Sequence, residues 1–124
     1  LEGLGHLLQT VELIRDNFNP ALKIMGILFT MYDRRTTLSQ EVVSEVRKHY
    51  DGHVLSTMIP RSVRLGEAPS HGLPISLYAP ESAGALAYEK LSEEVMNIIE
   101  PIQNPDVKIV SRETILSEKG ELNG

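Results

Sequence analysis

Two arginines, Arg35 and Arg64, each follow an apolar run that has the character of a buried strand. A guanidinium stays charged at every relevant pH and can bind phosphate through two parallel hydrogen bonds. The loops that follow strands in an open α/β sheet are the usual place for ligands. Arginines in such loops can recognise phosphate. The residues by themselves favour the plainer interpretation, in which both are solvated loop arginines or pair with carboxylates such as Asp33 or Glu67.

Other chemistry is poorly supported by the residues present. The sequence has no Gly-Lys pair, so it lacks the loop with which nucleotide-hydrolysing proteins cradle phosphates. Asp33 lies after a strand end, but it has no defined second carboxylate, which favours a turn or an ion pair with Arg34 or Arg35. His49 and His53 have the i, i+4 spacing of metal ligands, yet Asp51-Gly52 interrupts the helix. We expect neither a catalytic residue nor a metal site.

The apolar periodicity predicts alternating helices and strands. Helical spacing, a continuous apolar run or turn residues mark each segment. The segments are a helix over 4–18, a strand over 23–31 buried on both faces, a helix over 39–50 capped by Ser39, a strand over 54–59, a long ordered loop over 60–80 and a helix over 82–100. On the second helix, Val42, Val43 and Val46 form the apolar face.

This order predicts an α/β fold with a doubly wound, mostly parallel sheet. Two strands cannot make such a sheet alone, so we expect it to be incomplete in this chain and its other strands to lie upstream. The chain also opens without Met inside a helical pattern, and we expect it to be the carboxyl-terminal portion of a longer protein. Residues 101–124 are polar and are expected to form a mobile tail.

Composition narrows the class of protein. The chain has 124 residues, a net charge of -5 and 41% hydrophobic residues, which is typical of a soluble globular domain. It has no cysteine, which excludes disulfides and thiol chemistry, and no apolar run of the ~20 residues that a membrane helix needs. The acidic net charge weighs mildly against nucleic acid, but the arginines are concentrated at two loops, and local fields decide phosphate binding.

Three stretches resemble the ParA/Soj family of deviant-Walker ATPases, which partition bacterial chromosomes and plasmids. Residues 59–75 read IPRSVRLGEAPSHGLPI, similar to the family pattern IPRNVRLSEAPSHGKPI. Residues 26–36 read GILFTMYDRRT, similar to GVLLTMxDxRT, and residues 1–8 read LEGLGHLL, similar to ALEGLxxLL. The resemblance covers about residues 1–100. It implies that this segment is the carboxyl-terminal part of a ParA-like, P-loop NTPase-like ATPase domain.

The resemblance assigns roles to six residues. It implies that Arg35 and Arg64 contribute to DNA binding without sequence preference. It also implies that four residues at the two strand ends border the adenine of ATP: Thr30, Met31, Pro60 and Arg61. The family binds ATP and Mg²⁺ through a phosphate loop and aspartates upstream of this segment. We therefore expect neither ATP hydrolysis nor tight cofactor binding by this chain alone.

The resemblance further implies partners and a location. The intact protein would be a cytoplasmic, nucleoid-associated homodimer that binds nonspecific DNA and a ParB-type partner, with no attachment to a membrane. The alternative is a non-catalytic regulatory or scaffolding relative that acts through protein contacts. Departures from the pattern leave the strength of DNA binding open, because Leu73 and Ala83 stand where the family commonly has basic residues; Gly66 and Ala79 also differ.

Overall fold

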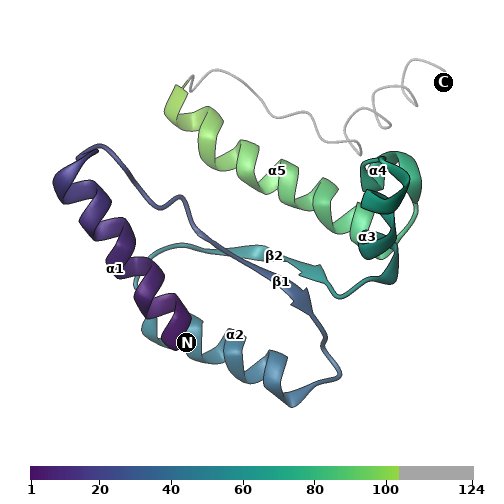
Figure 1. The fold of residues 1–124 in the computed structure, drawn as a ribbon, viewed down its shortest axis with the longest axis horizontal. Helices are drawn as coiled ribbons and strands as arrows, with labels where there is room; N and C mark the ends of the chain where they lie inside the picture. Colours follow the sequence, from purple (N-terminus) through teal and green to yellow (C-terminus); the bar gives the residue numbers. More distant parts are fainter. Residues whose placement is uncertain (104–124) are drawn as a thin grey trace, which may run out of the picture.

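The structure, a computed structural model, describes residues 1–103 (Figure 1). Five of its elements correspond to those predicted from the sequence: α1 (Glu2–Asn17), β1 (Ile27–Tyr32), α2 (Thr37–His49), β2 (Val54–Pro60) and α5 (Ala83–Gln103). Three short helical segments lie between β2 and α5: α3 (Val63–Glu67), the 3₁₀ helix η1 (Ala68–His71) and α4 (Ile75–Tyr78).

The strands β1 and β2 pair in parallel, and α2 makes the crossover between them. In Figure 1, α5 lies on one side of this strand pair, whereas α1 and α2 lie on the other. Helices on both faces of parallel strands are the arrangement expected of an α/β sheet. The predicted fold class is therefore confirmed: the chain has the mixed α/β architecture of a partial P-loop NTPase-like sheet.

The first strand is shorter and less buried than predicted. It begins at Ile27 rather than at residue 23, because the first cross-strand hydrogen bond runs from the Ile27 N–H to the His53 carbonyl at 2.9 Å. β2 starts at Val54, so residues 23–26 have no strand beside them. No residue of β1 is fully buried. Within residues 1–103, only β2 pairs with it, which explains why the predicted two-sided burial is not seen.

The second helix begins earlier than predicted because its cap is Thr36 rather than Ser39. Thr36 has an extended backbone, and its side chain accepts a hydrogen bond from the Ser39 N–H at 3.3 Å, as N-cap residues do. The Ser39 hydroxyl instead accepts from the Asp33 N–H. The hydrogen bond from the Asp33 N–H to the Ser39 hydroxyl therefore connects the first turn of α2 to the turn that carries Arg34 and Arg35.

The segment predicted as a loop over 60–80 is ordered, but it is largely helical. Its prolines mark helix starts: Pro69 lies in the first turn of η1, and Pro74 caps α4. Proline is tolerated there because the first N–H groups of a helix have no partner within the helix. Gly72 ends η1 with a φ of 63°, a left-handed conformation that favours glycine.

A small core lies where β2 meets its neighbours. Its buried apolar residues are Val43, Val46, Leu55, Ile59, Ala68 and Ala85. Two residues of the predicted α2 face are therefore buried, whereas Val42 is 37% exposed. On α1 no side chain is buried, and Phe18, the last residue of the predicted helix, follows α1 and is 85% exposed.

The helix predicted over 82–100 is α5, which runs from Ala83 to Gln103. The predicted tail over 101–124 lies almost entirely outside the described residues. Among the helices of residues 1–103, none has the length and apolarity needed to cross a bilayer.

A carboxylate on α5 compensates for an irregularity in β2. The register advances from Ile27↔Val54 to Phe29↔Met58, so β2 uses more residues than β1 over this interval. Such a bulge leaves backbone N–H groups out of the ladder. The Glu94 carboxylate accepts from the Ser56 N–H at 2.6 Å and from the Thr57 N–H at 2.9 Å. Glu94 therefore fixes α5 to the bulged strand.

The pKa of Glu94 reflects this role. Burial raises the pKa, but hydrogen bonds from Thr57 and from the Ser56 backbone more than offset burial, and the pKa falls below its ordinary value of 4.5. When folding lowers the pKa of a carboxyl group, the ionised group stabilises the folded state at any pH above the pKa that it has in the unfolded state. This stabilisation is lost as the pH falls through the pKa of the folded state and the carboxylate is protonated.

We expect Glu94→Gln to lower the free energy of unfolding of the full-length protein by about 1–2 kcal/mol, because an amide replaces one of the two acceptors. Urea unfolding at pH 7 measures the loss. Glu93→Gln is the matched control, since its carboxylate makes no hydrogen bond or ion pair within residues 1–103. The difference in the free energy of unfolding between wild type and Glu94→Gln should become smaller below pH 4.5, because acid then protonates the Glu94 carboxylate. Equal stability at pH 7 would contradict the proposed role of Glu94.

Candidate functional site

The carboxyl ends of the two strands meet at one edge of the sheet. Tyr32 pairs with Pro60, and the Arg61 N–H donates to the Tyr32 carbonyl at 3.0 Å, just where both strands stop. A groove of about 610 Å³ opens there. It is lined by the two strand ends, the turns after them and the start of α5: Tyr32, Asp33, Arg34, Arg35, Pro60, Arg61, Val63 and Ala83.

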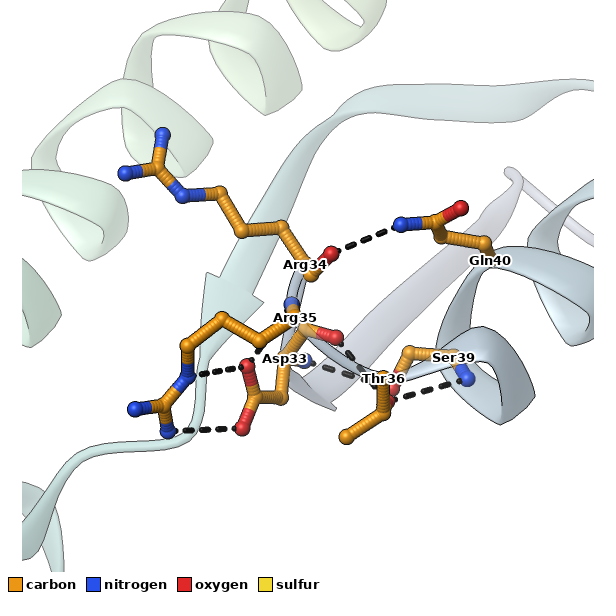
Figure 2. A network of polar contacts seen from close by, with 6 residues as sticks. All are labelled: Asp33, Arg34, Arg35, Thr36, Ser39 and Gln40. Carbon is orange, nitrogen blue, oxygen red and sulfur yellow. Dashed lines mark hydrogen bonds and ion pairs between the residues drawn. The ribbon is translucent and has the colours of Figure 1, made fainter.

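The turn after β1 holds Arg35 in a two-pronged ion pair with Asp33 (Figure 2). The Arg35 Nε and Nη2 donate to the two carboxylate oxygens of Asp33 at 3.0 and 2.9 Å, and the Arg35 N–H donates to Oδ1 at 3.0 Å. Hydrogen bonds from the side chain and backbone of Arg35 lower the pKa of Asp33 from 3.8 to about 2. Arg35 nevertheless remains 83% exposed.

The same turn is fixed from both sides by its own polar contacts. The Thr36 N–H and hydroxyl both donate to the Asp33 carbonyl at 3.0 Å. From α2, the Gln40 amide donates to the Arg34 carbonyl at 2.7 Å (Figure 2). A turn with this many internal bonds presents its side chains from a defined backbone, which lowers the entropy lost on binding.

Arg64 lies in a second ion pair, in the helical segment after β2. Its Nη1 donates to the Glu67 Oε2 at 3.2 Å, and the Tyr78 hydroxyl donates to the same oxygen at 2.5 Å. The tyrosine hydrogen bond is the main cause that lowers the pKa of Glu67 and raises the pKa of Tyr78. His71 completes the cluster, with its ring centroid 4.7 Å from that of Tyr78.

Close packing fixes this cluster relative to α5. Gly84, in the first turn of α5, is buried, and a β-carbon there would lie 2.6 Å from the Leu65 side chain. Any larger residue at position 84 would therefore require the Leu65 side chain to shift. Leu65 is the neighbour of Arg64 on α3, so Gly84 allows α5 to pack closely against the segment that carries this arginine.

Of the four residues predicted to border adenine, two line the groove and two do not. Pro60 and Arg61 line the groove beside Tyr32, whereas Thr30 and Met31 are exposed and are not among its lining residues. Met31 has a φ of 53°, which is uncommon for a residue with a side chain. The register supports a bulge here, because β1 advances from Phe29 to Tyr32 while β2 advances only from Met58 to Pro60.

The residues present fit part of an ATP site. Tyr32 and Pro60 offer apolar surface for a base at the sheet edge. The sequence has no phosphate loop, and the one carboxylate among the groove residues, Asp33, is ion-paired. Within residues 1–103, no group of three or more His, Asp or Glu side chains could hold a metal ion. His49 instead contacts Glu45 at 3.2 Å.

The structure thus places the two arginines that were predicted to bind DNA in two separate ion pairs. Arg35 lines the strand-end groove, while Arg64 is not among the groove residues and belongs to the neighbouring cluster. The alternative considered for both, pairing with Asp33 and Glu67, describes their contacts here. Sequence reasoning did not identify Tyr78, because nothing in the sequence links it to Glu67 eleven positions earlier.

Comparison with known proteins agrees with the fold. Residues 3–75 match the family model described as "CobQ/CobB/MinD/ParA nucleotide binding domain". The chain is 56% identical to the chromosome-partitioning ATPase Soj of Treponema pallidum, over 77% of this chain and 38% of that relative. It is 53% identical to Soj of Thermus thermophilus, over 77% of this chain and 39% of the relative.

A third relative is the sporulation initiation inhibitor protein Soj of Bacillus subtilis, 53% identical over 77% of this chain and 38% of that protein. The chain thus spans less than two-fifths of the length of these relatives. The matched family model covers both strands and the helical segment that carries Arg64. The chain therefore belongs to the family of CobQ/CobB/MinD/ParA nucleotide-binding domains, in its ParA/Soj branch.

Proposed function

We propose that this chain is the carboxyl-terminal part of a ParA/Soj-like ATPase that segregates chromosomes or plasmids. In the intact protein, ATP would bring two subunits together, and the dimer would bind nucleoid DNA without sequence preference. One observation carries this proposal: both motif arginines are exposed, on segments that directly follow neighbouring parallel strands. The names of the relatives, which include chromosome-partitioning ATPases, support the cellular role.

In this proposal the residues have separate tasks. Arg35 and Arg64 contact DNA phosphates, and Pro60 and Arg61 border the adenine base. Thr30 and Met31 keep the same assignment on the strength of their motif alone, since they lie outside the groove. ATP and Mg²⁺ would be held mainly by upstream residues, and a ParB-type partner would stimulate hydrolysis. The protein would be cytoplasmic and nucleoid-associated.

One observation favours a second candidate, a regulatory or scaffolding relative that has lost ATPase action. Both motif arginines are already neutralised by carboxylates, as in a surface built for structure rather than for DNA. The presence or absence of an upstream phosphate loop of the KGGxGKT type separates the two candidates, because the phosphates of ATP need that cradle.

The first test concerns ATP. We expect the full-length protein to hydrolyse Mg-ATP and a polypeptide of residues 1–124 to show no turnover, because this segment has no phosphate loop. A phosphate-release assay on both preparations measures the difference. Turnover by residues 1–124 that a substitution within this segment abolishes would place the active site here and contradict the proposal. An inactive full-length protein would favour the scaffolding candidate.

The second test concerns the motif arginines. In the full-length protein, Arg35→Ala and Arg64→Ala should each weaken binding to unrelated DNA duplexes by similar factors and leave ATP affinity unchanged. Each should flatten the dependence of log affinity on log salt by about 0.9, because each removes one phosphate contact. Lys23→Gln is the control, since Lys23 precedes β1 and so lies at the opposite end of the strands. Unaltered DNA binding in both arginine variants would refute the proposal.

The third test concerns the carboxylate that holds Arg35. Asp33→Asn keeps an oxygen that can accept the Arg35 N–H, but it removes the charge that pairs with the guanidinium. We expect DNA affinity to rise several-fold. Acidification cannot substitute for this change, because Asp33, with a pKa of about 2, stays ionised in any DNA-binding buffer.

Fluorescence anisotropy with a labelled duplex measures this effect. Glu12→Gln on α1 is the matched control, because it removes one negative charge away from the groove. If Asp33→Asn weakened DNA binding while the control did not, Asp33 would position Arg35 for DNA rather than compete with it. The hypothesis that the Asp33 carboxylate competes with a DNA phosphate for Arg35 would then be wrong.

A further inference from the structure

Two arginines of the strand-end groove have no carboxylate of their own. Arg34 and Arg61 both line the groove, and neither side chain makes a hydrogen bond or ion pair within residues 1–103. Figure 2 shows the contrast on one turn: the Arg34 and Arg35 side chains extend toward the same side, but only Arg35 reaches Asp33. The motif that identifies Arg35 leaves position 34 unspecified.

The backbones that carry these two side chains are anchored. Arg34 lies in the turn held by the Thr36 bonds to the Asp33 carbonyl, and its own carbonyl accepts from Gln40 at 2.7 Å. Arg61 donates its N–H to Tyr32 at 3.0 Å, so it is fixed to the end of the other strand. The two arginines thus line one groove from the ends of the two paired strands, on backbones that are held by hydrogen bonds.

The charge of the groove is not balanced by its own residues. Its lining holds three guanidiniums and one carboxylate, Asp33. Both oxygens of Asp33 accept hydrogen bonds from Arg35, and the positive charge of Arg61 further lowers the pKa of Asp33. No lining carboxylate is left for Arg34. An excess of positive charge in a groove attracts an anion, and guanidinium pairs match the geometry of phosphate oxygens.

We propose that Arg34 and Arg61 form a phosphate site in the strand-end groove, and that the site binds a phosphate of the DNA backbone. This inference deepens the proposed function and rests on it. A DNA phosphate fits better than a free nucleotide because Arg34, Arg35 and Arg61 are all exposed, so a long polyanion reaches them without entering a closed cavity. Arg34 also has no ion pair to break on binding, in contrast to Arg35.

The experiment uses the full-length protein with Arg34→Gln, Arg61→Gln and the double variant, measured by anisotropy on a duplex over a range of salt concentrations. Each single substitution should weaken DNA binding several-fold, equally on unrelated sequences, and lower the salt slope by about 0.9. Arg34→Gln should cost at least as much affinity as Arg35→Ala. Arg34→Lys, which keeps a point charge, should retain most of the salt slope. Lys23→Gln controls for the loss of one charge elsewhere.

A parallel measurement of the affinity for a slowly hydrolysed ATP analogue identifies the source of the phosphate. Arg34→Gln identifies the source, because Arg61 also borders the adenine in the proposed function and Arg61→Gln is expected to weaken binding of the analogue as well. Unchanged analogue affinity of Arg34→Gln with weakened DNA binding supports the proposal. Weakened analogue affinity of Arg34→Gln with unchanged DNA binding would assign Arg34 to the nucleotide and overturn it. Wild-type behaviour of both single variants and of the double variant would mean that the groove is only solvated.

The failure of this inference can be distinguished from the failure of the proposed function. If Arg35→Ala and Arg64→Ala weaken DNA binding while Arg34→Gln and Arg61→Gln do not, only the additional phosphate site is wrong. If none of the four changes DNA binding, nonspecific DNA binding by this surface is wrong as a whole. Unchanged thermal melting of each variant ensures that lost binding is not lost folding.

Discussion

The parallel pairing of β1 with β2 determines where every candidate functional residue lies. Parallel strands end at the same edge, so the turn after Tyr32 and the helical segment after Pro60 start side by side. The hydrogen bond from the Arg61 N–H to the Tyr32 carbonyl is the last one between the two segments at this edge. An antiparallel pairing of the same two segments would separate Arg35 and Arg61 by the length of a strand.

That pairing is irregular, and each irregularity lies beside a feature of interest. The bulge around Ser56 and Thr57 is compensated by Glu94, which ties α5 to β2. The irregularity near Met31, with its φ of 53°, comes immediately before Tyr32 and the arginine turn. Bulges commonly redirect side chains at the edges of sheets and next to sites. The cost of a left-handed backbone at Met31 is consistent with such a role in aiming the turn.

Electrostatic compensation divides the arginines of this edge into two classes. Arg35 and Arg64 are neutralised by Asp33 and Glu67, which keeps them ordered but makes any phosphate compete with a carboxylate. The side chains of Arg34 and Arg61 make no hydrogen bond or ion pair within the described residues, although the charge of Arg61 is near enough to lower the pKa of Asp33. Under the proposed function, DNA would bind first to Arg34 and Arg61, and Arg35 and Arg64 would join only as a phosphate displaces their carboxylates. Exposed ion pairs are weak enough for this exchange.

The sequence by itself determined the order of the main elements and the family. Helical periodicity, apolar strands and three long motifs are local properties, readable along the chain, and Val43 and Val46 were placed correctly in the core. Tertiary structure alone decided that β1 starts at Ile27, because a strand exists only where a partner lies beside it. It also decided the contacts of the site. Glu94 meets β2, and Tyr78 meets Glu67, across separations that no local pattern encodes. Which arginines are paired depends on distances between side chains, and those distances are set by packing rather than by residue type.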